Sequence, residues 1–204
     1  MSMPVIALGR QFGSGGREIG RKLAEQLTCP FYDRELISLA AKRAEVREEL
    51  FAGKDEKAGN PWLFTSVYEG GSLVRRGRSA EDILFEMQIQ VILELAEQGP
   101  CIIVGRCADH VLRQAGVPVC SLFLCAPFTW RVAHRMEIEG ISEAQAADTV
   151  RRLDKQRRKY YTTYTGRDWG LPENYDLCIN TSVLGIEGTA QALREHLTGS
   201  RMFS

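Results

Sequence analysis

The sequence has no net charge and no long apolar run, and each absence excludes a class of protein. Its 26 Lys and Arg residues balance 26 Asp and Glu residues, so no overall field favours nucleic acid or an anionic membrane. No apolar run approaches the ~18 residues that a membrane-spanning helix needs. The opening stretch MSMPVIALGR also lacks the basic flank and apolar core of a secretory signal. We therefore expect a cytoplasmic protein with no nucleic-acid or membrane partner.

The cysteines and histidines lack the spacing of metal sites. The six cysteines form no C-x-x-C pair, which structural zinc sites and redox motifs usually contain. Most of them lie in or beside apolar runs, as small buried residues do in a reducing compartment. The three histidines are scattered along the chain and indicate neither a catalytic triad nor a metal site. Any chemistry must therefore come from other residues.

What the sequence does contain is an alternation of short apolar runs with helical stripes. The runs, each expected to be a strand, cover residues 5–8, 30–32, 101–104, 119–125 and 175–180. Between them apolar residues recur at helical spacing, as at Ile19, Leu23 and Leu27. Strands that alternate with helices favour a parallel sheet. The 204 residues therefore predict one α/β domain, with a five-stranded parallel sheet and helices on both faces.

Two helix starts carry the signature of a capping box. Ser79 with Asp82 precedes one apolar stripe, and Ser142 with Gln145 precedes another. Before the first of these helices, residues 47–80 mix charges, glycines and a few aromatics. We interpret that stretch as an insertion within the domain and not as a linker between domains.

A glycine-rich loop separates the first predicted strand from the first predicted helix. Its candidate phosphate-binding residues are Phe12, Gly13, Ser14, Gly15, Gly16, Arg17 and Glu18. Glycine lets the backbone approach an anion, and the first N–H groups of a helix lack partners and carry the positive end of its dipole. A tight turn without a ligand would show the same pattern, so the loop alone leaves both interpretations open.

The loop lacks the lysine of the P-loop pattern G-x-x-x-x-G-K-[ST]. With Gly15 placed on the second glycine, Arg10 takes the place of the first. Gly16 then falls on the lysine, and Arg17 falls on the Ser/Thr position. Arg17, or an arginine from elsewhere, could supply the missing charge. Glu18 is a candidate Mg²⁺ ligand, since a carboxylate can bind the ion directly or through water.

Four blocks of the sequence resemble the bacterial cytidylate kinase-like family, a relative of cytidylate kinase within the nucleoside monophosphate kinase fold. They read VIALGRQFGSGGREIGRKLAEQL, PFYDRELI, CIIVGRCADHVL and YDLCINTS, and they occur in family order over nearly the whole chain. The resemblance implies a three-layer P-loop NTPase fold with a helical lid at about residues 127–170 and an acceptor-binding insertion at about residues 33–80. It also implies ATP and Mg²⁺ as cofactors, and glycine at the lysine position is habitual in this family.

The resemblance also points to acceptor-binding residues. Cytidylate kinases hold the acceptor nucleotide with a Gly-Arg-Asp block, and Arg106 matches its arginine. Cys107 falls on the aspartate of that block, and Asp109 could take over its polar role. A helix-start residue on the surface is the alternative for Arg106. Three residues after the second predicted strand could face the acceptor as well: Tyr32, Asp33 and Arg34, of which Asp33 is equally suited to cap a helix.

Basic residues are dense in the helix that starts after Ser142. Monophosphate kinases close a lid arm over the phosphates with arginines, and closure excludes water from the transferred group. The resemblance therefore makes catalytic candidates of Arg151, Arg157 and Arg158, and places Asp154 with the substrate. Arg131 and Arg135, just after the run 119–125, are a further pair of catalytic candidates, with a helix surface as the alternative. Arg157 lies close to the apolar stripe of this helix and is predicted to point inward. The alternative is a solvated helix with i, i+4 pairs such as Asp154 with Arg158.

These observations together predict an ATP-dependent phosphotransferase that resembles cytidylate kinase. It would move the γ-phosphate of ATP to a nucleoside monophosphate, with a CMP-like acceptor. Two alternatives remain open at this point. The chain could be a non-catalytic nucleotide-binding or regulatory protein with a degenerate P-loop, or a kinase of a small non-nucleotide metabolite.

Overall fold

The centre of the structure is a parallel sheet of five strands. It is a computed structural model, which describes residues 3–33, 36 and 80–199. The strands are β1 (Val5–Arg10), β2 (Phe31–Tyr32), β3 (Ile102–Val104), β4 (Val119–Cys125) and β5 (Leu177–Asn180). Their order in the sheet is β2-β3-β1-β4-β5, and every neighbouring pair is parallel. The predicted five-stranded parallel sheet is confirmed, with β1 at its centre.

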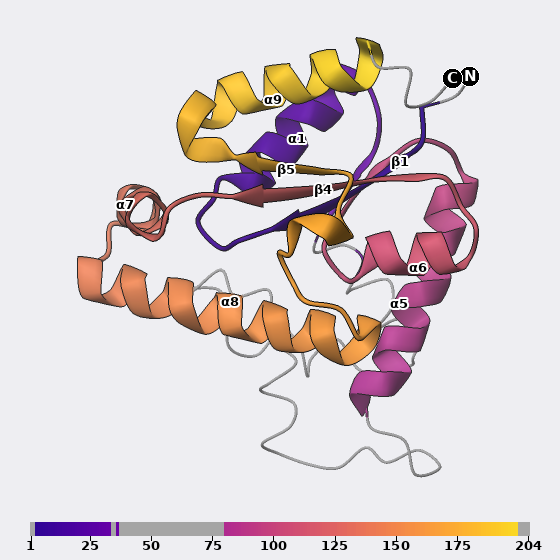
Figure 1. Cartoon of the computed structure of the whole chain (residues 1–204), viewed down its shortest axis with the longest axis horizontal. Coiled ribbons are helices and arrows are strands. Elements are labelled where there is room, and N and C mark those ends of the chain that lie inside the picture. Colours follow the sequence, from indigo (N-terminus) through magenta and orange to yellow (C-terminus); the bar gives the residue numbers. More distant parts are fainter. Residues whose placement is uncertain (1–2, 34–35, 37–79, 200–204) are drawn as a thin grey trace.

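Helices cover both faces of this sheet. They are α1 (Gly16–Leu27), α5 (Ala80–Glu97), α6 (Ala108–Gln114), α7 (Phe128–Glu139), α8 (Glu143–Thr165) and α9 (Thr181–Gly199), with a 3₁₀ turn at Pro172–Asn174. In Figure 1, α1 and α9 lie on one face, and α5 and α6 lie on the other. The predicted three-layer arrangement is therefore confirmed. Among the described residues, no helix is both long and apolar enough to cross a membrane.

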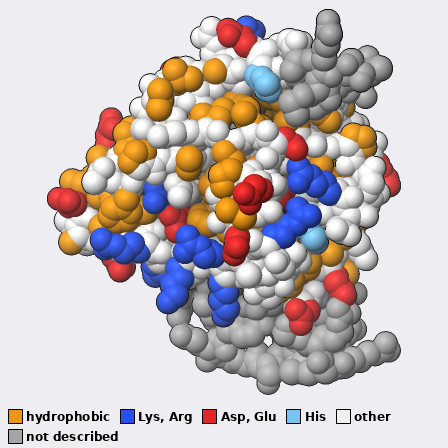
Figure 2. Space-filling view, viewed as in Figure 1, with side chains coloured by type: hydrophobic (Ala, Val, Ile, Leu, Met, Phe, Trp, Pro, Cys, Tyr) orange, Lys and Arg blue, Asp and Glu red, His pale blue; other side chains and the backbone are white. Residues whose placement is uncertain are grey.

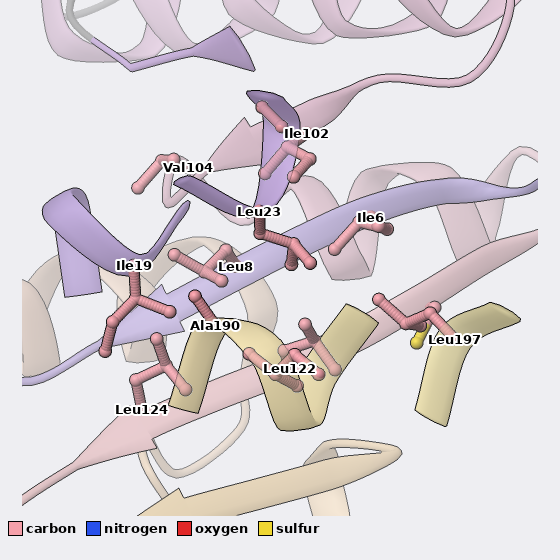
Figure 3. Close-up of a cluster of buried hydrophobic side chains, with 13 residues drawn as sticks. Ile6, Leu8, Ile19, Leu23, Ile102, Val104, Leu122, Leu124, Ala190 and Leu197 are labelled. Carbon is pink, nitrogen blue, oxygen red and sulfur yellow. The ribbon is translucent and has the colours of Figure 1, made fainter. Parts of the chain in front are cut away.

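The side chains of β1 alternate between two cores, as those of a strand buried on both faces must. Ile6 and Leu8 point to the α1 and α9 side, whereas Val5 and Ala7 point to the α5 and α6 side. Figure 3 shows Ile19 of α1 packed with residues of β1, β4 and α9 in the first of these cores. The predicted Ile19, Leu23 stripe is thus the buried face of α1. This packing fixes α1 against the end of β1, where the glycine-rich loop lies.

The lid consists of α7 and α8, which follow β4. In Figure 1, α8 runs along the lower side of the molecule, and its last turns approach α5. There the Tyr160 hydroxyl donates to Gln88 Oε1 at 2.8 Å, and the ring of Tyr164 stacks on Phe85 at 4.0 Å between centroids. The carboxyl-terminal end of α8 therefore packs against α5, whereas α7 begins just after β4.

The predicted capping box of Ser142 and Gln145 begins α8. The Gln145 N–H donates to Ser142 Oγ at 3.4 Å, and the Ser142 N–H donates to Gln145 Oε1 at 3.0 Å. The other predicted box cannot be compared, because Ser79 lies outside the described residues, as does most of the predicted insertion over 33–80. Only one of the two helix starts is therefore tested, and it is confirmed.

Replacing Ser142 with alanine should lower the free energy of unfolding by about 1 kcal/mol, because the first turn of α8 loses a side-chain acceptor. Urea denaturation followed by circular dichroism measures this change. Ser142→Asp is the matched control, since it retains an acceptor at the cap and should unfold at nearly the wild-type urea concentration. An unchanged midpoint for Ser142→Ala would mean that the cap adds nothing to stability.

All six cysteines are unpaired, and Cys101, Cys107 and Cys120 are buried. Burial raises the pKa of Cys101 and of Cys120 to about 11, so both thiols stay protonated near neutral pH. Within the described ranges, no group of three His, Cys, Asp or Glu residues is placed to hold a metal ion. These cysteines pack in the core, as their apolar surroundings in the sequence predicted.

Candidate active site

The glycine-rich loop turns the chain from β1 into α1. Gly13 and Gly15 adopt positive φ values of 81° and 74°, a region in which glycine has no steric cost. Ser14 is fully buried, and its hydroxyl donates to Gln11 O at 2.9 Å. Its carbonyl accepts from Thr181 Oγ1 at 2.7 Å. The loop is therefore held from behind by the first residue of α9, and its front faces a cavity.

Backbone N–H groups line that front. In the part of the chain that the structure describes, no protein acceptor receives the N–H groups of Gly13, Gly15, Gly16, Arg17 and Glu18. Three of these groups belong to the first turn of α1 and carry the positive end of its dipole. Such a cluster is a ready-made site for an anion. The geometry is therefore suited to binding an anion.

Cationic side chains surround the cavity in front of the loop. Four arginines line it, together with Glu18 and His134: Arg10, Arg17, Arg135 and Arg157. The Arg135 guanidinium lies 4.7 Å from the centroid of the Phe12 ring, and Arg157 lies 5.5 Å from the same ring. His134 Nδ1 is 2.8 Å from Gly13 O, so this nitrogen carries the proton and donates it. The cavity thus combines N–H groups with positive charge.

The lid is docked on the loop through Phe12. Its backbone N–H donates to Asp154 Oδ1 at 2.7 Å, and its carbonyl accepts from Arg131 Nη1 at 3.0 Å. Arg131 in turn donates to Asp154 Oδ2 at 2.5 Å. The Phe12 side chain is buried against residues of α7 and α8, among them Val132 and Leu153. These contacts hold the lid helices against the glycine-rich loop.

Asp154→Asn tests how much the contacts of Asp154 contribute to holding the lid helices on the loop. The amide loses the charge that pairs with Arg131, so the free energy of unfolding should fall by about 2 kcal/mol. Proteolysis should also begin in α8 sooner than in the wild type. Asp148→Asn on the exposed side of the same helix is the matched control and should behave as the wild type does. Equal unfolding of both variants would show that the Asp154 contacts do not hold the lid.

A second cavity lies beyond the carboxyl ends of β1 and β3. Aromatic residues form much of its wall: Tyr160, Tyr161, Trp169 and Tyr175. Polar residues enter from the strand ends, from α6 and from α8: Arg10, Asp33, Arg106, Asp109 and Arg157. Ligands of open α/β sheets bind at this edge, because the loops that follow parallel strands meet there. The cavity is suited to a flat or ring-shaped molecule that carries negative charge.

Arg106 enters this cavity from an unusual turn of the backbone. Gly105, Arg106 and Cys107 have positive φ values of 71°, 59° and 56°, although two of them are not glycine. A left-handed residue with a side chain costs of order 1–3 kcal/mol, and such strain clusters at functional sites. Arg106 is 9% exposed, its guanidinium lies 5.7 Å from the centroid of Tyr160, and burial lowers its pKa. The strained turn holds a buried cation at the strand end.

Asp109 lies in the first turn of α6 and closes the same cavity. It is 6% exposed and accepts a hydrogen bond from the Tyr161 hydroxyl at 2.7 Å. Burial raises the pKa of Asp109, and burial together with Asp109 raises that of Tyr161. The pair therefore places a short polar contact next to the aromatic part of the wall.

The two cavities meet at Arg10, Asp33 and Arg157, which line both of them. Asp33 Oδ1 lies 3.0 Å from Arg10 Nη2, and Asp33 Oδ2 lies 3.1 Å from Arg17 Nε. Arg157 Nη1 donates to Arg10 O at 2.8 Å. Positive charge exceeds negative charge at this junction, because one carboxylate faces several guanidinium groups.

The pKa values at the junction reflect this excess. Burial raises the pKa of Asp33, but the charges of Arg10 and Arg17, followed by those of Arg106 and Arg157, lower it overall below its usual 3.8. Burial, and next the charge of Arg10, lowers the pKa of Arg157 to about 9. An anion bound at the junction would offset the repulsion among these arginines. The electrostatics thus favour a negatively charged ligand at the junction.

A shallow apolar groove adjoins the phosphate-loop cavity. It is lined by Trp130 and Ile138 of α7 and by Leu184 and Ile186 on either side of a kink at Gly185. Glu18, His134 and Ile138 line both the groove and the cavity. Ile138 and Leu184 are 49% and 53% exposed, which is high for large apolar side chains. The groove offers an apolar surface next to the anion site.

The structure places the predicted site residues in different surroundings. Those that line a cavity are Phe12, Gly13, Gly15, Gly16, Arg17, Glu18, Asp33, Arg106, Asp109, Arg135 and Arg157. Arg131 and Asp154 instead form the buried contacts between lid and loop, and Arg151 lies on an exposed face, 4.8 Å from the ring of Phe128. Arg158 is exposed as well and lies 5.8 Å from the ring of Trp169. Arg34 lies outside the described residues.

Several details differ from the sequence-based expectations. The alternative of a solvated helix included an i, i+4 pair of Asp154 with Arg158, but Asp154 pairs with Arg131 of α7 instead. Ser14 faces the interior, and Tyr32 packs beside the core around α5 instead of lining a described cavity. Figure 2 shows basic side chains gathered along the lower left, over α8. This exposed stripe comprises Arg151, Arg152, Lys155, Arg158 and Lys159, whereas Arg157 of the same helix is buried.

The sequence analysis missed three kinds of contributor. Arg10 was considered only as a departure from the motif, yet it joins both cavities. His134 was set aside as a scattered histidine, although its spacing of three residues from Arg131 placed it on the same face of α7. The aromatic wall comes from Tyr160, Trp169 and Tyr175, and no pattern links its members across the turn that separates α8 from β5.

The sheet order, the glycine-rich loop and the helical lid define the class: this is the P-loop kinase fold. A crystal structure of shikimate kinase from Acinetobacter baumannii in complex with shikimate has this fold, with a TM-score of 0.55 and 17% identity over 98% of this chain and 96% of that one. The crystal structure of a protein from Eubacterium ventriosum is more similar, with a TM-score of 0.70 and 26% identity over 97% and 99% of the two chains.

Within this class, residues 5–183 match the family model of the cytidylate kinase-like family, and the chain belongs to that family. A cytidylate kinase from Pyrococcus horikoshii is 32% identical over 108 residues, which are 52% of this chain and 55% of that protein. The match thus spans about half the length of the relative. The resemblance inferred from the four sequence blocks is confirmed.

Proposed function

We propose that this protein is an ATP-dependent phosphotransferase that moves the γ-phosphate of ATP to an acceptor held in the aromatic cavity. One observation carries the proposal: two cavities, one lined by unused N–H groups and the other by aromatic rings, meet at Arg10, Asp33 and Arg157. Phosphoryl transfer needs reactants in line and charge neutralised more than it needs covalent help from the protein. A junction rich in arginine supplies both conditions.

The donor would lie along the loop and the apolar groove. The N–H groups of Gly13 to Glu18 would bind its phosphates, as helix N-termini bind anions. The adenine ring would rest on the groove between α7 and the Gly185 kink, against Trp130 and Ile186. His134 and Ile138 line both places, so one extended ligand could occupy them together.

The residues at the loop also fit Mg²⁺, which is usually held by one or two carboxylates together with substrate phosphates. Glu18 lines the loop cavity and would hold the ion there. When bound, Mg²⁺ would neutralise charge on the transferred phosphate and orient its oxygens. The protein's own part is to position the phosphates with backbone N–H groups and to balance their charge with arginines.

A nucleoside monophosphate of the CMP type fits the second cavity. Arg106 would hold the acceptor phosphate from the end of β3, and the rings of Tyr160 and Trp169 would contact its base. No protein base is needed for such an acceptor, because its phosphate oxygen is already a nucleophile. Asp109, bonded to Tyr161, would offer the base a polar contact.

Asp33 favours a second candidate, a kinase of a small hydroxylated metabolite. Its carboxylate lies at the junction of the two cavities and is ionised at neutral pH, since nearby arginines lower its pKa. A hydroxyl acceptor needs a base to receive its proton, and a carboxylate at this place could serve. A phosphate acceptor would meet the same carboxylate as a repulsive charge, so the two candidates predict different acceptors.

A coupled ATP-consumption assay tests the proposal against nucleoside monophosphates and small hydroxylated metabolites in parallel. Turnover with CMP or a related monophosphate would support the first candidate, and turnover with hydroxylated metabolites alone would support the second. Arg106→Met should raise KM for a monophosphate acceptor by at least about tenfold, because the acceptor phosphate loses a charged partner. Tight ATP binding without turnover for any acceptor would overturn the proposal and leave a nucleotide-binding protein.

A further inference from the structure

The position of the missing P-loop lysine is occupied by the stem of another side chain. Gly16 is the first residue of α1, at the place where the P-loop pattern has lysine. A Cβ atom built on Gly16 would lie 2.9 Å from Arg10 Cβ, 3.0 Å from Cδ and 3.4 Å from Cγ. Real Cβ atoms essentially never lie within 3.0 Å of another atom, so a side chain at position 16 would force the stem of Arg10 to shift.

The guanidinium of Arg10 continues from there to the junction of the cavities. Its Nη2 lies 3.0 Å from Asp33 Oδ1. Its Nη1 lies close to Gly105 as well, 3.6 Å from the position that a Cβ atom would take on that glycine. The side chain is 11% exposed and lines both cavities. It therefore passes from the end of β1, over the start of α1, to the place where donor and acceptor would meet.

We propose that Arg10 supplies the charge that lysine supplies in other P-loops, contacting the transferred phosphate from β1 instead of from α1. The inference rests on the proposed function and names the residue that compensates for Gly16. In this arrangement the glycine is required, because only a residue without a side chain leaves room for the Arg10 stem. The arginine at position 10 and the glycine at position 16 are two departures from the P-loop pattern that depend on each other.

The other arginines fit this role less well. Arg17 is 38% exposed and pairs with Asp33 from the next position of α1, beside the junction and not across the lysine site. Arg135 is bound to Glu139 on its own helix and lies over the Phe12 ring. Arg157 enters from the lid and donates to the Arg10 carbonyl, so its position depends on the chain at Arg10.

Binding of ATP and ADP to four variants, measured by isothermal titration calorimetry, tests the proposal. Arg10→Met keeps the stem on Gly16 and removes the charge, so the affinity for ATP should fall by about 10- to 100-fold and that for ADP by less. Gly16→Lys alone should weaken ATP binding at least as much, because the lysine side chain would compete with the Arg10 side chain for the same space. The double variant R10G/G16K, which restores the usual pattern, should bind ATP at least about tenfold more tightly than Gly16→Lys.

Thermal unfolding identifies any variant that has not folded, and Arg152→Ala on the exposed face of α8 is the matched control. Wild-type affinity for ATP in Arg10→Met, or in Gly16→Lys, would overturn the role of Arg10. If ATP binding depends on Arg10 but no acceptor is phosphorylated, the proposed function fails and this inference stands. If an acceptor is phosphorylated equally well by Arg10→Met, the inference fails and the proposed function stands. A wild-type protein that binds no ATP would overturn both.

Discussion

Arg157→Met is expected to lower kcat/KM by about a thousandfold, which is the lower end of what an arginine at a transferred phosphate contributes. Arg157 is 9% exposed and lines both cavities. Its Nη1 donates to Arg10 O at 2.8 Å, and its guanidinium lies 5.5 Å from the centroid of Phe12. Methionine fills a similar volume, so the lid should stay docked while the charge is lost. Steady-state kinetics with the acceptor found in the screen measures the effect.

Two companion variants show whether charge or geometry is responsible. Arg157→Lys keeps a positive charge, but its ammonium group lacks the planar fork that lets arginine donate to the Arg10 carbonyl and to a phosphate at the same time. It should therefore recover only part of the rate. Arg152→Ala lies on the exposed face of the same helix and should retain wild-type kinetics. Wild-type turnover by Arg157→Met would show that the inward arginine of the lid does not take part in the reaction.

The pKa of Arg157 explains why this cation should act on an anion and not serve as a structural ion pair. Burial and the charge of Arg10 lower its pKa to about 9, although the side chain remains charged at pH 7. A buried cation kept for stability would normally have a carboxylate bonded to it. The bond that Arg157 makes is to a neutral carbonyl. Asp154 and Asp33 offset part of the shift from nearby positions, and a bound phosphate would add negative charge at the guanidinium itself.

The elements of the fold follow from the sequence because each rests on local periodicity. The run 119–125 coincides with β4, and the stripe that begins at Ile19 is the buried face of α1. The cap at Ser142 and the inward direction of Arg157 were predicted in the same way, from residues within two turns of one helix. Patterns with a period of two or 3.6 residues are set by the geometry of the element itself.

The site was less predictable because its contacts join residues far apart in the sequence. Helical spacing alone suggested that Asp154 would pair with Arg158, but the Phe12 N–H and Arg131 offer it better-aligned partners on another element. Arg10 was visible as a departure from a motif, yet only the approach of its stem to Gly16 shows that the two changes belong together. Periodicity predicts which face of its own element a residue occupies. It does not predict which residues of another element will contact it.

Asp33→Asn should lower the free energy of unfolding by about 3 kcal/mol at pH 7, as the loss of one partner from a buried ion pair usually does. The carboxylate is 8% exposed and forms ion pairs with Arg10 and Arg17 through its two oxygens. Without it, the arginines of the junction repel one another with no buried negative charge between them. Urea denaturation at several pH values measures the loss, with the exposed Asp148→Asn as the matched control.

The pH dependence identifies the carboxylate as the cause. The pKa of Asp33 is lowered in the folded protein, so its contribution is present above the unfolded value of about 3.9 and is lost as pH falls through the folded value. The difference in stability between wild type and Asp33→Asn should therefore be constant near pH 7 and shrink below about pH 4. A difference that stays constant down to pH 2.5 would attribute the loss to packing and not to charge.

The same variant distinguishes the two proposed acceptors. Removal of the carboxylate leaves one more unbalanced positive charge at the junction, so ATP and inorganic pyrophosphate should bind Asp33→Asn more tightly and restore part of its stability. If the acceptor is a phosphate, turnover should persist, because no proton has to be removed from its oxygen. If the acceptor is a hydroxyl, kcat should fall by about 10²- to 10⁴-fold, the usual contribution of a general base. Weaker pyrophosphate binding by Asp33→Asn would contradict the excess of positive charge on which the site depends.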